Sequence, residues 1–126
     1  RQINLPVYID YMVVSSYGNS AETSGVVRII KDLEDNIEEK NIIIVEDIID
    51  TGLTLAYLKQ NLLSRLPKSL KICTLLDKPA RREKEITIDY KGFEVPDEFI
   101  IGFGIDYAEK YRNLPFVGTL KREVYE

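Results

Sequence analysis

The fold of this chain is decided at residues 41–54, which read NIIIVEDIIDTGLT. Residues 42–45 are apolar on successive positions, which is the pattern of a strand buried on both faces of a parallel sheet. Over residues 53–66 apolar side chains recur at helical spacing, and Pro67 ends the expected helix. A second apolar run follows at residues 70–76, so we expect a right-handed β-α-β unit and an α/β fold with a mostly parallel sheet.

Outside this unit, short runs rich in Val, Ile, Tyr and Phe predict further strands. They cover residues 7–15, 26–31, 99–103 and 116–120. A second, shorter helix is expected at residues 107–112. The chain has 126 residues, of which 44% are hydrophobic, and this size suits one domain with one core.

Composition and charge exclude several kinds of function. The 17 Lys and Arg residues against 21 Asp and Glu residues give a net charge of −4, which does not favour a nucleic-acid partner. The chain has no histidine, so Ser-His-Asp catalysis and histidine-based zinc sites are ruled out. Its single cysteine, Cys73, allows no intrachain disulfide and fits a reducing cytoplasm. No apolar stretch approaches the roughly 20 residues that span a bilayer, so no membrane partner is expected.

Polar residues gather at the carboxyl end of the expected buried strand, where open α/β sheets bind ligands. The following helix start has unpaired N–H groups and a positive dipole end, and Thr51 and Thr54 add hydroxyl donors, so this turn suits a phosphate monoester. A helix-capping role for Asp50 or Thr51 is the simpler alternative. Capping does not explain the adjacent carboxylates of Glu46 and Asp47, which repel each other unless they meet hydroxyl donors or a divalent cation. A ribose 5-phosphate with Mg²⁺ nearby satisfies both features.

Residues 46–54 resemble the phosphoribosyl pyrophosphate motif of type I phosphoribosyltransferases: two acids, two aliphatic residues, Asp, Thr, Gly, any residue and Thr. Three further matches narrow the resemblance to the hypoxanthine-guanine branch. They are Tyr17 after Ser15-Ser16, Lys78 in the run Leu76-Asp77-Lys78-Pro79, and the run FIIGFGIDY at residues 99–107. The similarity extends over about residues 5–124. It implies a type I phosphoribosyltransferase core, with a mostly parallel sheet flanked by helices and a partial hood region.

The resemblance implies purine salvage, in which the 5-phosphoribosyl group of phosphoribosyl pyrophosphate passes to hypoxanthine or guanine, giving IMP or GMP and pyrophosphate. It assigns Asp50 as the general acid or base beside the purine imidazole nitrogen. The residues it assigns to the phosphoribosyl group are Glu46, Asp47, Asp50, Thr51, Gly52, Leu53 and Thr54. Those it assigns to the purine are Lys78, Phe99, Ile100 and Asp106. Lys78 is expected to donate to the 6-oxo group and Phe99 to stack on the base; considered alone, they would be a solvated strand-end lysine and a core aromatic residue.

The remaining parts of the site follow from the same resemblance. Mg²⁺ is the implied cofactor, and its implied ligands are Glu46, Asp47 and Asp106. Arg112 is expected to contact pyrophosphate, although Asp106 and Arg112 taken alone would be assigned to surface ion pairs. Ser16 and Tyr17 match a loop that closes over the reacting atoms and shields them from water.

The main departure from the family lies at the amino terminus, where the family carries a further segment with a first core strand and a small loop at the pyrophosphate site. We therefore expect residues 1–126 to form a single phosphoribosyltransferase domain that lacks this part. The implied partners are phosphoribosyl pyrophosphate, 6-oxopurine bases and further copies of the chain in a dimer or tetramer. Two alternatives remain open: an enzyme that prefers xanthine, and a non-catalytic RNA-binding regulator of the same fold, similar to the pyrimidine operon attenuator.

Overall fold

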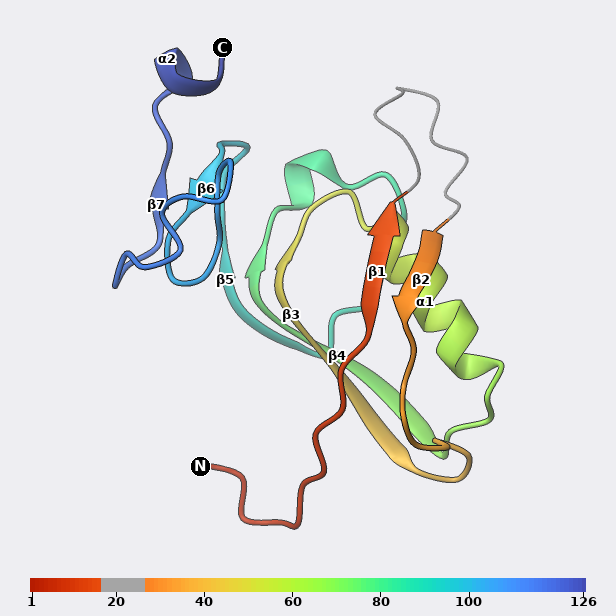
Figure 1. Ribbon diagram of the computed structural model, residues 1–126. Coiled ribbons are helices and arrows are strands. Elements are labelled where there is room, and N and C mark those ends of the chain that lie inside the picture. Colours follow the sequence, from red (N-terminus) through yellow and green to blue (C-terminus); the bar gives the residue numbers. More distant parts are fainter. Residues whose placement is uncertain (17–26) are drawn as a thin grey trace.

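The computed structural model describes residues 1–16 and 27–126. Its main body is a three-stranded sheet with a helix against it, and two short antiparallel strand pairs lie outside this sheet (Figure 1). The strands are β1 (Val13–Ser16), β2 (Val27–Lys31), β3 (Asn41–Ile49), β4 (Ser69–Asp77), β5 (Tyr90–Glu94), β6 (Ile100–Ile101) and β7 (Gly118–Thr119). The helices are α1 (Leu53–Leu63), the short 3-10 turn η1 (Pro79–Arg81) and α2 (Arg122–Tyr125).

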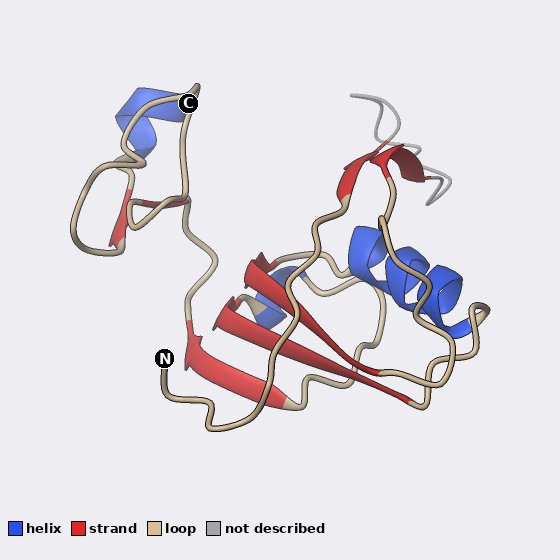
Figure 2. Ribbon diagram, turned by 60° about the horizontal axis from the view of Figure 1, so that its bottom comes forward, coloured by secondary structure: helices blue, strands red, loops and turns tan. Residues whose placement is uncertain are grey.

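The central sheet has the strand order β3-β4-β5, and both neighbouring pairs are parallel. The chain passes from β3 through α1 to β4, as the β-α-β pattern predicts. Helix α1 lies against one face of the sheet, where Ile44 and Ile72 meet Leu58 in a buried apolar cluster (Figure 2). The pair β1–β2 lies beside the same helix, and Met12 and Val14 pack against that cluster. The prediction of an α/β fold with a mostly parallel sheet is confirmed.

Strand β3 differs from its predicted form in two ways. It extends to Ile49, so Glu46 and Asp47 lie within the strand and not after it. It is also not buried on both faces, because Ile43 is 52% exposed and Val45 is 74% exposed. The prediction of full burial is wrong because helix α1 covers only the face that carries the buried cluster.

The structure corrects two other expectations and adds one strand that was not expected. Strand β1 is shorter than expected, because the preceding residues 7–12 are mostly exposed and lie outside any strand. Residues 107–112 form no helix, because left-handed φ angles of 50°, 64° and 77° occur at Ala108, Glu109 and Tyr111. Strand β5 has the sequence YKGFE, with charged residues and a glycine in place of an apolar run, so the sequence pattern does not predict it.

Residues 95–126 form a small unit that lies to one side of the central sheet in both views (Figures 1 and 2). The strands expected at residues 99–103 and 116–120 are reduced here to β6 and β7, which pair antiparallel. The Phe99 ring holds the unit together, since it contacts the Tyr107 and Tyr125 rings at centroid distances of 5.2 Å and 5.3 Å. We assign the expected partial hood region to this unit. Within the described part of the chain, every helix is too short or too polar to span a bilayer.

Candidate active site

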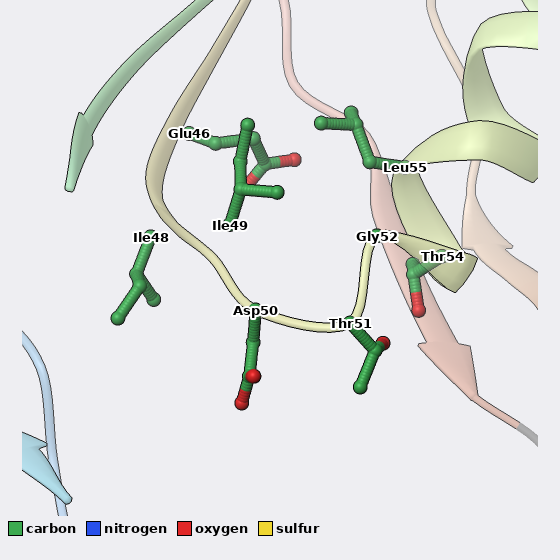
Figure 3. Close-up of a pocket in the computed structure, with 8 residues that line it drawn as sticks. All are labelled: Glu46, Ile48, Ile49, Asp50, Thr51, Gly52, Thr54 and Leu55. Atoms are coloured by element: carbon green, nitrogen blue, oxygen red, sulfur yellow. The ribbon is translucent and has the colours of Figure 1, made fainter. Parts of the chain in front are cut away.

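A cavity of about 180 Å³ lies where β3 ends and α1 begins. It is lined by Glu46, Ile48, Ile49, Asp50, Thr51, Gly52, Thr54 and Leu55 (Figure 3). The cavity occupies the predicted crevice at the carboxyl end of a parallel strand. Of the residues assigned to the phosphoribosyl group, only Asp47 and Leu53 are absent from its lining. The turn between strand and helix therefore gathers carboxylates, hydroxyls and amides in one place.

The first turn of α1 has no side-chain cap. Its N-cap residue is Gly52, which has a left-handed φ of 81°, and the Leu53 amide donates only a long hydrogen bond of 3.4 Å to Thr51 Oγ1. Asp50 does not cap the helix, so the capping explanation of this residue is wrong. The amides of the first turn have no acceptor within the helix, and with the Thr54 hydroxyl they suit an anion.

Gly52 is the point at which a second segment of the chain approaches this turn. A Cβ atom at Gly52 would lie 2.9 Å from Ile86 Cδ1, 2.9 Å from the Lys84 carbonyl oxygen and 3.0 Å from Arg82 Cδ. These distances are too short for a Cβ, and the left-handed φ is a conformation that glycine adopts without strain, so only glycine fits. In the structure the close approach is made by residues 82–86.

The two adjacent acids of β3 have different surroundings. Glu46 lines the cavity, and its burial, followed by the charge of Asp47, raises the pKa of the Glu46 carboxyl above its ordinary value. Asp47 is exposed, and its Oδ1 accepts a hydrogen bond of 2.7 Å from the Ile48 amide. Within residues 1–16 and 27–126, no three acids, cysteines or histidines form one metal-binding group. A hydroxyl donor or a cation beside Glu46 would compensate for its buried charge.

A second cavity, of about 100 Å³, is lined by Lys78, Arg81, Asp97, Glu98, Phe99 and Tyr125. Lys78 is only 5% exposed, and its Nζ donates a hydrogen bond of 2.7 Å to the Glu98 carbonyl oxygen. The alternative of a solvated strand-end lysine is therefore wrong. Phe99 is 37% exposed, which leaves part of its ring open beside this lysine. A buried ammonium next to a partly open aromatic ring suits a flat ligand with a hydrogen-bond acceptor on its edge.

An ion pair between Asp50 and Arg81 connects the two cavities. Asp50 lines the first cavity and Arg81 the second, and Arg81 Nη1 lies 3.5 Å from Asp50 Oδ2. The other carboxylate oxygen, Asp50 Oδ1, is buried and has no hydrogen-bond partner among the described residues. Since a buried acceptor without a donor costs free energy, Oδ1 would be stabilised by a proton or by a donor that reaches it.

Asp106 and Arg112 lie together in the unit of residues 95–126. Arg112 Nη2 is 3.2 Å from Asp106 Oδ1, and Arg112 Nη1 donates a hydrogen bond of 2.9 Å to the Gly104 carbonyl oxygen. The Arg112 side chain is 52% exposed, so the ion pair contributes little to stability. Neither residue lines the two cavities, and the roles predicted for Asp106 and Arg112 stay predictions.

Three more residues of the predicted site have no tested role. Ile100 is 5% exposed and pairs with Thr119 between β6 and β7. Ser16 is the last residue of β1, and Tyr17 lies outside the described residues. The base contact of Ile100 and the closing loop at Ser16 and Tyr17 therefore stay predictions.

The structure adds site residues that the sequence analysis does not single out. Arg81 and Arg82 follow Lys78 in a short link after β4, and both contact Asp50. Tyr125 comes from the last turn of the chain and lines the second cavity. Two adjacent arginines so soon after Lys78 are the signal in the sequence that points to this link. Tyr125 gives no comparable signal.

Comparison with known proteins gives the family of this chain. Residues 1–108 match the phosphoribosyl transferase domain. The chain is 56% identical to the hypoxanthine-guanine phosphoribosyltransferase of Bacillus subtilis (strain 168), over 100% of this chain and 70% of that protein. It is 50% identical to the hypoxanthine-guanine phosphoribosyltransferase of Mycobacterium avium, over 100% of this chain and 62% of that protein. The crystal structure of a hypoxanthine phosphoribosyltransferase from Staphylococcus aureus matches with a TM-score of 0.93 at 52% identity, covering 98% of this chain and 67% of that one.

The parallel sheet, the uncapped helix start and the matched domain together define a phosphoribosyltransferase, and the chain belongs to that family. Within the family it belongs to the hypoxanthine-guanine branch, the phosphoribosyltransferases of purine salvage. The chain spans between 62% and 70% of the length of these relatives.

Proposed function

We propose that this protein transfers the 5-phosphoribosyl group of phosphoribosyl pyrophosphate to hypoxanthine or guanine, giving IMP or GMP and pyrophosphate. One observation carries the proposal: Asp50, which lines the first cavity, forms an ion pair with Arg81, which lines the second. On one side lies a helix start with free amides and hydroxyls, and on the other a buried ammonium beside the Phe99 ring. The reaction joins a sugar phosphate to a flat base, and so it needs two such sites on either side of the new bond.

Asp50 is the proposed general base for this step. The purine nitrogen forms its bond to the ribose C1′, while the bond from C1′ to pyrophosphate breaks and its electron pair leaves with pyrophosphate. The proton displaced from the imidazole ring of the purine passes to Asp50. The buried Oδ1 of Asp50, which has no partner among the described residues, supports this role.

The same two cavities support the roles proposed for the other residues. The amides of residues 51–54 and the hydroxyls of Thr51 and Thr54 bind the 5-phosphate. The ribose hydroxyls donate to Glu46, whose buried charge calls for such donors, and to Asp47. At the other end, Lys78 donates to the 6-oxo group and Phe99 stacks on the base, assignments that rest on the lining of the second cavity and on the resemblance. Ile100 offers backbone groups to the edge of the base, an assignment that rests on the resemblance alone.

Mg²⁺ is the proposed cofactor, and Glu46, Asp47 and Asp106 are its proposed ligands, of which any one ion would take only one or two. Carboxylates are the hard oxygen ligands that this ion prefers, and it commonly takes one or two of them and fills its other positions with water and substrate phosphates. The absence of a three-acid cluster in the described part of the chain is compatible with this kind of site. When bound, Mg²⁺ would offset charge on the leaving pyrophosphate, to which Arg112 also binds in this proposal.

The setting of the reaction is also proposed. We place the protein in the cytoplasm, since Cys73 is a free cysteine. We further propose that residues 1–126 act as a single domain within a dimer or tetramer. The resemblance to the family supports such an assembly.

The experiment that tests the proposal measures pyrophosphate release by the natural protein that carries this chain. Phosphoribosyl pyrophosphate and Mg²⁺ are supplied with hypoxanthine, guanine, xanthine or adenine in turn, and retention of RNA on a filter is measured in parallel. Release with hypoxanthine or guanine supports the proposal. Release with xanthine in clear preference would move the protein to the xanthine alternative. RNA retention without any purine-dependent release would contradict an enzymatic role.

A further inference from the structure

The link between β4 and β5 folds back against the phosphate-binding turn. Arg82 Nε donates a hydrogen bond of 3.0 Å to the Asp50 carbonyl oxygen. The amides of Glu83 and Lys84 donate to the Thr51 carbonyl oxygen at 2.9 Å and 3.2 Å. These hydrogen bonds and the tight packing around Gly52 all join residues 50–52 to one continuous segment, residues 82–86.

Arg82 is itself fixed by a buried ion pair. Its side chain is 13% exposed, and its Nη2 pairs with Asp77 Oδ1 at the end of β4, where the Asp77 side chain is 7% exposed. Lys91 of β5 lies 3.5 Å from the other oxygen of Asp77. The guanidinium therefore bridges two strands: one edge faces Asp77 of β4, and the Nε–H points to the carbonyl at the end of β3. A planar group with several donors in fixed geometry can hold both contacts at once.

We propose that Arg82 is a positioning residue for the transfer reaction: it fixes the main chain of residues 50–52, and thereby the Asp50 carboxylate and the amides that receive the 5-phosphate. This inference rests on the proposed function. It goes beyond that function because Arg82 lines neither cavity and acts through residues that do. A turn with a left-handed residue and no side-chain cap has little stability of its own, and so its geometry depends on such outside support.

The structure also links this support to the base site. The Lys78 amide donates a hydrogen bond of 2.9 Å to the Ile49 carbonyl oxygen, immediately before Asp50. From Lys78, the short turn η1 leads directly to Arg82. The segment from Lys78 to Arg82 therefore forms hydrogen bonds with the main chain on both sides of Asp50. The bond from Arg82 comes from a side chain, so a single substitution removes it.

The test compares Arg82→Met and the double variant Asp77→Asn/Arg82→Met with wild type in the natural protein. Arg82→Met alone leaves Asp77 with one cationic partner fewer, so some loss of stability is expected. The double variant neutralises that carboxylate and should recover thermal stability, but it cannot restore the bond to the Asp50 carbonyl. Arg65→Met is the matched control, since Arg65 binds Asp32 through two contacts of 2.8 Å and 3.1 Å and lines neither cavity.

We expect both Arg82 variants to lose about 10- to 100-fold in kcat/KM for phosphoribosyl pyrophosphate, with a higher KM for that substrate, because small misplacements of a reacting group cost rates of this order. Arg65→Met should keep wild-type kcat/KM. Amide hydrogen exchange at residues 52–54 should be faster in both Arg82 variants than in Arg65→Met, a readout that needs no turnover. Recovery of wild-type kcat/KM by the double variant, or unchanged exchange at residues 52–54, would overturn the proposal. Absence of turnover in wild type would instead contradict the proposed function, and the exchange measurement would still decide the role of Arg82.

Discussion

Replacement of Lys78 by methionine tests the proposed base site most directly. Lys78 is 5% exposed, and among the described residues its ammonium has one hydrogen-bond partner, the Glu98 carbonyl oxygen, so further donors remain for a ligand. A 6-oxo group can accept from this ammonium, whereas the 6-amino group of adenine is itself a donor and gains nothing from it. Methionine keeps the apolar stem of the side chain and removes only the donor.

The magnitude follows from the burial of Lys78. Leaving a buried donor or acceptor unsatisfied costs about 1–3 kcal/mol, and a charged group costs more. Since 1.4 kcal/mol corresponds to a tenfold change, Lys78→Met should lower kcat/KM for hypoxanthine and guanine by about 5- to 150-fold. Any residual activity with adenine should stay nearly unchanged. The preference for 6-oxopurines should therefore fall by the same factor.

The assay is kcat/KM for hypoxanthine, guanine and adenine, at saturating phosphoribosyl pyrophosphate, and the readout is the ratio between bases within each protein. Lys78→Met also removes the donor to the Glu98 carbonyl oxygen, which can destabilise the protein. The ratio between bases cancels any loss of activity from partial unfolding, because such a loss affects all bases equally. The matched control is Lys71→Met, at the other end of β4, where the lysine is exposed and its ammonium lies 5.7 Å from the centroid of the Tyr90 ring. A Lys78→Met enzyme with an unaltered preference for 6-oxopurines would refute the assignment.

The other predictions concern Asp50 and three further residues of the candidate site. Asp50→Asn should lower kcat by about 10²- to 10⁴-fold with little change in phosphoribosyl pyrophosphate binding, and near-normal turnover would remove Asp50 from the role of general base. Phe99→Ala should weaken all purines alike, which the same three-base comparison checks, because stacking does not distinguish them. Gly52→Ala should cost at least about 1–2 kcal/mol in urea unfolding, since its φ is left-handed and its Cβ would meet Ile86; an unchanged free energy of unfolding would contradict this. Glu46→Gln should stabilise the ligand-free protein at neutral pH and not in acid. Because the folded pKa of Glu46 is raised, the stability of the wild type falls as the pH rises from the ordinary carboxyl pKa to the folded value, and the full penalty is present above the folded value. A gain of equal size at both pH values would speak against a partly buried charge at Glu46.

Much of the core could be predicted from local sequence. Helix α1 and strand β4 lie close to their predicted bounds, because helical spacing of leucines, a following proline and a short apolar run act within a few residues of chain. The same local pattern locates the turn at residues 50–54 at the end of β3. Because a helix connects the two strands, a parallel pairing of β3 and β4 is then the expected arrangement, and it is the one observed.

Other parts of the fold depend on contacts between distant segments. Strand β5 has no apolar run, and it forms because Tyr90 and Phe93 pair with Cys73 and Leu76 of β4. The expected helix at residues 107–112 is replaced by a turn in which the Glu109 amide donates to Asp106 Oδ2. Pairing partners and left-handed turns of this kind are selected by the surrounding structure, and periodicity in one segment carries no information about them.

For the site, the sequence alone predicts which residues would bear the chemistry: a motif of acids, hydroxyls and glycine from Glu46 to Thr54, then Lys78 and Phe99. Their environments come from the tertiary structure. It buries Lys78, leaves the start of α1 without a side-chain cap and Asp50 Oδ1 without a partner among the described residues, and brings Arg82 against the turn at residues 50–52. Burial and hydrogen-bond partners are set by how the link after β4 folds back across the end of β3. That path depends on close packing at Gly52 and on a buried ion pair, both of which join segments far apart in the chain.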